Sequence, residues 1–252
     1  MAGFLAGLLG IGGGLVIVPA LAWLLAGRAG DYAMHMAVAT SLATILGTGS
    51  ASVLAHHRRG AVAWSAVLRL TPGLLAGSLI AAWIARQLSS PQLKICFAVF
   101  CVFAAFQLAR RTRPTSPDVP RTRPGAPELT AAGAGIGVIS SLVGIGGGTL
   151  TVPYLHWRNH TIHASVATSA ACGLPIALAG TVGYIWTGQQ ISGLPAPHLG
   201  FVYLPAWLGI LATSMLFAPL GAQAAHKLPT QSLRRVFALF LVIVAMVLLA
   251  SG

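Results

Sequence analysis

Acidic residues are almost absent from this chain of 252 residues, which holds three Asp and Glu against fifteen Lys and Arg. The three carboxylates, Asp31, Asp118 and Glu128, all fall between apolar runs, so no predicted membrane segment contains one. Proton relays and cation sites inside membranes usually depend on buried carboxylates. The shortage therefore argues against a cation as the substrate.

Charged residues of either sign are also scarce, at 7% against about 25% in soluble domains, and the mean hydropathy is +0.82. The net charge of +12 does not indicate nucleic acid, because the arginines fall between apolar runs, as they do in membrane proteins. Cys96, Cys101 and Cys172 have no metal-binding spacing, and we predict no metal or cofactor. The sequence shows no nucleophile paired with a base, so we predict that the protein is not an enzyme.

Long apolar runs make up most of the chain, and each is about long enough to cross a bilayer. They lie at 2–26, 34–55, 62–86, 92–110, 129–157, 162–187, 199–225 and 232–250. The sequence predicts an all-α, multi-pass membrane protein with about eight transmembrane helices embedded in lipid. A basic, proline-rich linker at 111–128 separates a first transmembrane repeat, 1–110, from a second, 129–252. Nothing in the sequence indicates the oligomeric state.

The two repeats share two motifs. GIGGGLVIVP at 10–19 matches GIGGGTLTVP at 144–153, and HMAVATS at 35–41 matches HASVATS at 163–169. Adjacent glycines disfavour helix, and the proline five residues later removes a backbone donor. We therefore predict two homologous four-helix halves, each with a glycine-broken first helix. Paired breaks in the two halves of a membrane protein point to a transporter's substrate site.

The relative orientation of the halves depends on what the glycine segments do. Four full crossings per half would give both halves the same orientation, whereas segments that enter the membrane and return would invert them. The sequence favours four full crossings. That arrangement divides Lys and Arg seven against eight between the two sides, which is too even to fix the orientation in the membrane.

Candidate binding groups are the amides at the breaks and the hydroxyls of the repeated Thr-Ser pairs. Helix N-termini carry partial positive charge and free N–H donors, and glycine admits a close ligand, which together suit a small oxyanion. If these glycines bind the anion, alanine at either break should block transport and spare the fold. A helix-end histidine is more often structural, so His35 and His163 receive less weight. The predicted substrate contacts are Gly12, Gly13, Gly14, Thr40, Ser41, Gly146, Gly147, Gly148, Thr168 and Ser169.

The paired GIGGGxxxVP and HxxVATS motifs resemble the TauE/SafE-type sulfite exporter family, and the resemblance covers nearly the whole chain except the linker. It implies a permease of a bacterial-type plasma membrane (inner membrane), with export as the expected activity, for a small anion such as sulfite, an organosulfonate or a related sulfur oxyanion. The alternative is a non-transporting membrane scaffold or partner subunit. Such a protein would need no cavity, and the duplicated helix breaks argue against it.

Overall fold

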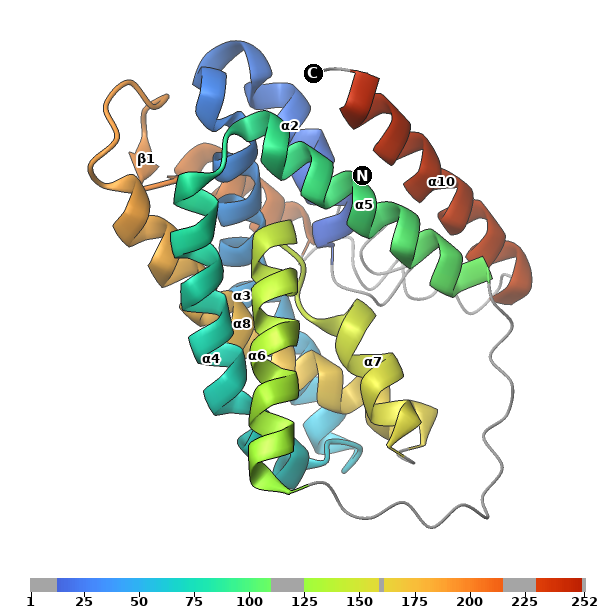
Figure 1. The fold of residues 1–252 in the computed structure, drawn as a ribbon. Coiled ribbons are helices and arrows are strands. Elements are labelled where there is room, and N and C mark those ends of the chain that lie inside the picture. Colours follow the sequence, from blue (N-terminus) through green and yellow to red (C-terminus); the bar gives the residue numbers. More distant parts are fainter. Residues whose placement is uncertain (1–12, 110–124, 159–160, 215–229, 251–252) are drawn as a thin grey trace.

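The computed structural model describes residues 13–109, 125–158, 161–214 and 230–250, and this part of the chain is almost entirely helical (Figure 1). The elements are α2 (Gly14–Ala29), the 3-10 turn η1 (Gly30–Tyr32), α3 (Ala33–Arg58), α4 (Trp64–Gln87), α5 (Ser90–Ala109), α6 (Ala126–Val143), α7 (Gly148–Trp157), α8 (Ile162–Gly188), the strands β1 (His198–Leu199) and β2 (Val202–Tyr203), a helix at Leu204–Ser214, and α10 (Thr230–Ala250). The short antiparallel hairpin β1–β2 is an addition to the expected helices.

The helices have the length and the surface of membrane segments. Four stretches are long and apolar enough to cross a bilayer, and three shorter helices are also apolar. Large apolar side chains such as Trp23, Leu68 and Trp83 lie exposed on the outside of the bundle, where a soluble protein would be polar. The predicted all-α, multi-pass membrane fold is confirmed.

The second glycine motif interrupts its apolar run, as predicted. α6 ends just before Gly144, whose φ of +75° is a left-handed conformation that glycine adopts without the steric cost of a Cβ. Gly147 is also left-handed, with φ +69°, and α7 begins at Gly148. In the first motif α2 begins at Gly14, the equivalent of Gly148, while Gly10–Gly12 lie outside the described residues.

The broken segment α6–α7 enters the membrane and returns to the face from which it came. Glu128 lies in the first turn of α6, Arg158 follows the last residue of α7, and their side chains form an ion pair. The ten residues of α7 cover about 15 Å, half of a hydrocarbon core about 30 Å thick. The expectation of four full crossings is therefore wrong for this half, because α7 turns back from the middle of the membrane.

Two crossed hydrogen bonds show that the halves are inverted relative to each other. Thr40, near the start of α3, accepts a hydrogen bond of 3.0 Å from the amide of Tyr203, which follows α8. Thr168, near the start of α8, accepts one of 3.0 Å from the amide of Ala63, which follows α3. The start of each helix thus lies beside the end of the other, so the equivalent helices α3 and α8 run antiparallel. Inverted repeats of this kind are common in secondary transporters.

The inverted arrangement defines two faces (Figure 1). We call the hairpin face the side where α2, α4 and α8 end, where α3 and α5 begin, and where β1–β2 lies. The linker face is the opposite side, where α3, α5 and α7 end and where α4, α6, α8 and α10 begin. The helices α5 and α10, which close the two halves, pack against each other along one flank of the bundle.

Small residues bring α4 and α6 into close contact across the two halves. A Cβ on Gly77 would overlap the carbonyl oxygen of Ala134, and one on Gly137 would lie 2.6 Å from the carbonyl oxygen of Leu74. Close approach through glycine is typical of membrane helices, where apolar burial alone does not drive association. The close packing of α4 against α6 therefore joins the first half to the second.

Candidate functional site

The two glycine motifs meet in the interior of the bundle. A Cβ on Gly14 would overlap the carbonyl oxygen of Gly144 and would lie 3.1 Å from the Cα of Ile145. The two backbones therefore touch, although the motifs belong to different halves. This contact places the starts of α2 and α7 at one junction, which the hypothesis of a shared site requires.

The junction brings together the N-termini of two helices. Gly13 is the N-cap residue of α2 and Gly147 is that of α7, and no side chain caps either helix. From this point α2 runs to the hairpin face and α7 runs to the linker face (Figure 1). Each helix N-terminus carries about half a positive charge and amides without helical partners. Two such ends provide a positive potential inside the membrane without a cationic side chain.

Side chains and backbone of α3 and α8 hold the second motif in place. Ser41 donates a hydrogen bond of 2.8 Å to the carbonyl oxygen of Gly144. On α8, a Cβ on Gly173 would lie 2.8 Å from the carbonyl oxygen of Gly146, so that helix also contacts the broken segment closely. Ile45 of α3 packs against Gly146 from the other side. The hydroxyl proton of Ser41 is thus used within the protein.

The other predicted hydroxyl residues lie elsewhere in the bundle. Thr40 and Thr168 are fully buried, and each accepts the crossed hydrogen bond that ties α3 or α8 to the other half. A threonine hydroxyl that accepts a bond can still donate its own proton. Ser169 donates 2.9 Å to the carbonyl oxygen of Val166 in its own helix. Within the described residues, Ser41 is the one member of the two pairs whose hydroxyl is hydrogen-bonded to a glycine motif.

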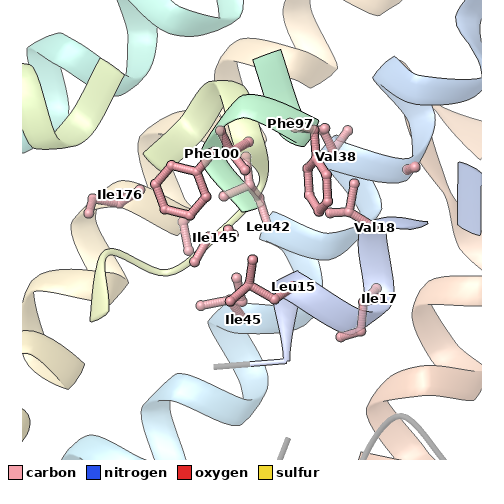
Figure 2. Close-up of a cluster of buried hydrophobic side chains, with 14 of the residues drawn as sticks. Leu15, Ile17, Val18, Val38, Leu42, Ile45, Phe97, Phe100, Ile145 and Ile176 are labelled. Carbon is pink, nitrogen blue, oxygen red and sulfur yellow. The ribbon is translucent and has the colours of Figure 1, made fainter. Parts of the chain in front are cut away.

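One side of the junction is filled by apolar side chains (Figure 2). Leu15 and Val18 of α2, together with Ile145 of the broken segment, pack into a cluster with α3 and α5. The remaining members drawn in the figure include Val38, Leu42, Ile45, Phe97 and Phe100. The side chains that Figure 2 labels on this side of the junction are all apolar.

The first turns of α7 carry two buried hydroxyls without partners. The side chain of Thr149 is 9% exposed and that of Thr151 is 0% exposed, and neither hydroxyl has a hydrogen-bond partner within the described residues. Thr151 Oγ1 would lie 3.4 Å from a Cβ on Gly147, so this hydroxyl is directed toward the helix N-terminus. A buried polar group that lacks a partner is costly, and such groups often mark a place for water, an ion or a ligand.

Sequence reasoning missed Thr149 and Thr151, although the signal was present. The two glycine motifs are identical at most positions, but the second holds threonines where the first holds Leu15 and Ile17. A comparison of the unequal positions, rather than the shared ones, would have identified them. Gly12, also a predicted contact, lies outside the described residues.

The chain belongs to the family described as sulfite exporter TauE/SafE, whose model matches residues 1–248. The match includes both glycine motifs, the linker and the described helices except the last two residues of α10. The chain is therefore a membrane transporter, set in a lipid bilayer and acting on a small molecule.

Similar proteins carry transporter names that give no substrate. A "Probable membrane transporter protein" of Haemophilus influenzae is 38% identical over 247 residues, which cover 97% of this chain and 93% of that protein. The "Probable membrane transporter protein YunE" of Bacillus subtilis is 26% identical, covering 100% of this chain and 95% of the relative. No solved structure shows a significant match.

Proposed function

We propose that the protein moves a small sulfur oxyanion or sulfonate, with sulfite as the first candidate, and that the anion binds at the N-terminus of α7. The observation that carries the proposal is the meeting of two helix N-termini beside two buried hydroxyls without partners. The description of the family as sulfite exporters supports the choice of substrate class.

The sign of the charge follows from what surrounds the junction. Asp31 lies in η1 at the hairpin face, and Glu128 lies at the linker face, where Arg158 neutralises it. The described membrane helices thus carry their carboxylates at the ends and not beside the junction. An anion there meets two positive helix ends and no buried negative charge, whereas a cation would be repelled.

The binding groups proposed for the anion are backbone amides and hydroxyls. Sulfite presents three oxygens that accept hydrogen bonds, and the start of α7 offers amide donors together with Thr149 and Thr151. The glycines of both motifs have no side chain to keep the anion from the backbone. Gly12–Gly14 and Gly146–Gly148 therefore remain the proposed backbone contacts. Thr40, Ser41, Thr168 and Ser169 remain proposed contacts for states in which their present bonds have changed.

The crossed bonds suggest how access could alternate. The bond from Tyr203 to Thr40 lies toward the hairpin face, and the bond from Ala63 to Thr168 lies toward the linker face. In inverted-repeat transporters the two halves exchange conformations around a central site. We propose that opening toward one face breaks the bond on that side and leaves the other in place.

Flux into proteoliposomes tests both the activity and the site. The purified protein is assayed with sulfite, thiosulfate, sulfate and taurine, first as wild type and then as the double variant Thr149→Val and Thr151→Val. Loss of two hydrogen bonds to an anion should lower sulfite flux by about tenfold or more. Thr71→Val is the matched control, because the Thr71 hydroxyl bonds to the carbonyl oxygen of Val67 in its own helix.

Each outcome decides a different point. A normal rate in the folded double variant would remove the site from the start of α7. The absence of flux for all four anions with the wild-type protein would contradict transport of sulfur anions and would favour the scaffold alternative. Loss in both the double variant and the control would show that the assay reports a general effect of Thr→Val substitution.

A further inference from the structure

The inverted topology changes how the basic residues are distributed between the two faces. Of fifteen Lys and Arg, the hairpin face holds three: Arg28, Arg86 and Lys94. Six others lie at the linker face within the described residues: Arg58, Arg59, Arg69, Arg158, Arg234 and Arg235. The remaining six lie outside the described residues, in the sequence that leads into α6 or α10, two helices that begin at this face: Arg110, Arg111, Arg113, Arg121, Arg123 and Lys227. Four crossings per half would divide Lys and Arg almost evenly between the two faces. The inverted topology instead assigns most of them to the linker face.

The placement of these residues follows from the described helices. Arg58 and Arg59 end α3, and Arg69 lies in the second turn of α4. The five linker arginines belong to the chain between the end of α5 and the start of α6, and both helix ends lie at this face. The last three cationic residues flank or open α10, which starts here as well.

Several of these cations are available to an outside partner. Arg58, Arg59 and Arg69 are exposed, whereas Arg158 is largely buried against Glu128 and the ring of Trp157. Trp64 is exposed beside the three arginines, at the start of α4, and its indole N–H donates 3.2 Å to His57 Nδ1. Tryptophan at the end of a membrane helix is typical of the headgroup level of a bilayer.

We infer that the linker face is cytoplasmic, and that Arg58, Arg59 and Arg69 form a binding surface for anionic phospholipid headgroups of the inner leaflet. Cytoplasmic loops of membrane proteins carry the excess of Lys and Arg, and short loops such as this linker obey the rule best. Arginines just beyond a helix end are attracted to the negative inner surface of the membrane. The inference rests on the fold and is independent of the substrate.

Labelling of single cysteines tests the orientation. Ser192, in the exposed segment before the β1–β2 hairpin, and Ser65, exposed at the start of α4, mark opposite faces. In intact cells, a membrane-impermeant maleimide should label Ser192→Cys, and it should label Ser65→Cys only after permeabilisation. The wild-type chain, with Cys96, Cys101 and Cys172, sets the background. The reverse labelling pattern, or equal labelling of both positions in intact cells, would overturn the orientation.

Retention of lipid tests the surface. Protein purified from vesicles of equal phosphatidylglycerol and phosphatidylethanolamine is analysed for bound lipid by native mass spectrometry. The variant Arg58→Gln with Arg59→Gln should retain less phosphatidylglycerol, by about fivefold for each arginine removed. The matched control carries Arg28→Gln and Arg86→Gln at the hairpin face and should retain the wild-type amount. Unchanged retention in the linker-face variant, or an equal loss in both variants, would overturn the surface.

Discussion

The two glycine motifs begin helices at equivalent positions, but the side chains that follow the glycines differ in polarity. Gly13 and Gly147 occupy equivalent N-cap positions, and each helix that follows contains the equivalent proline, Pro19 or Pro153. The first motif continues with apolar residues that pack into the core, whereas the second continues with Thr149 and Thr151, whose hydroxyls are buried. The duplicated backbone therefore builds the junction, and the second copy alone provides side-chain donors at it.

The repeated histidines show the same divergence between the halves. His35 is buried, and its Nε2 lies 2.9 Å and 3.1 Å from the carbonyl oxygens of Ala85 and Leu88 at the end of α4. Its ring also stacks on Phe201 of the hairpin turn, with centroids 5.2 Å apart. His163, at the equivalent position, is exposed. His35 thus joins α3 to the end of α4 and to the hairpin turn, whereas the exposed His163 makes no buried contact of this kind with the described residues.

The largest effect should come from removing the contact between the motifs. Gly14→Ala would place a methyl group on the carbonyl oxygen of Gly144, so the backbones of the two halves would have to move apart to accommodate it. We expect a loss of about 1–3 kcal/mol in the free energy of unfolding and no measurable flux. Gly27→Ala in the same helix is the control, because a Cβ there meets no atom within 4 Å. Unfolding in mixed micelles measures both variants, and equal stability of the two would contradict the contact.

The next effect should separate the equivalent N-cap glycines. From the sequence, alanine at Gly13 or Gly147 is expected to spare the fold equally. The structure distinguishes them, because Gly13 has φ −60°, whereas Gly147 has φ +69° and a Cβ there would lie 2.7 Å from Ile176 Cδ1. A left-handed alanine costs about 1–2 kcal/mol. Gly147→Ala should therefore melt several degrees below Gly13→Ala in detergent. Equal melting temperatures would show that the broken segment relaxes around the methyl group.

The sequence predicted the elements of this site better than their directions. Three adjacent glycines followed by proline are sufficient to predict the break after α6, and the repeat at 144–153 predicts that it matters. Hydrophobicity does not record direction, and 129–157 is one long apolar run, so nothing local shows that α7 turns back. The ion pair between Glu128 and Arg158 shows it, but that pair exists only after the two helices have folded together.

The role of the repeated threonines could not be predicted for a similar reason. Thr40 bonds to an amide 163 residues away, and Thr168 bonds to one 105 residues away. The repetition of the Thr-Ser pair in both halves predicted that these residues matter, but a bond to a backbone amide in the other half leaves no trace in the sequence. By contrast, Thr149 and Thr151 were identifiable, because an alignment of the two motifs shows threonine in the second where the first has an apolar residue.

The smallest effect should show where the halves remain equivalent. Thr40→Val and Thr168→Val each remove the acceptor of one crossed hydrogen bond and keep the shape of the side chain. Hydrogen bonds between membrane helices contribute about 0.6–1.7 kcal/mol, so each variant should lose a similar, small amount of unfolding free energy. Thr48→Val is the control, because the Thr48 hydroxyl bonds only to the carbonyl oxygen of Thr44 in its own helix within the described residues. His35 still joins α3 to the end of α4 at the hairpin face in the Thr40→Val variant. We therefore expect an impermeant thiol reagent to reach the hairpin face of Thr40→Val less readily than the linker face of Thr168→Val. Equal accessibility at the two faces would contradict the structural role of His35, and unequal stability would contradict the equivalence of the two crossed bonds.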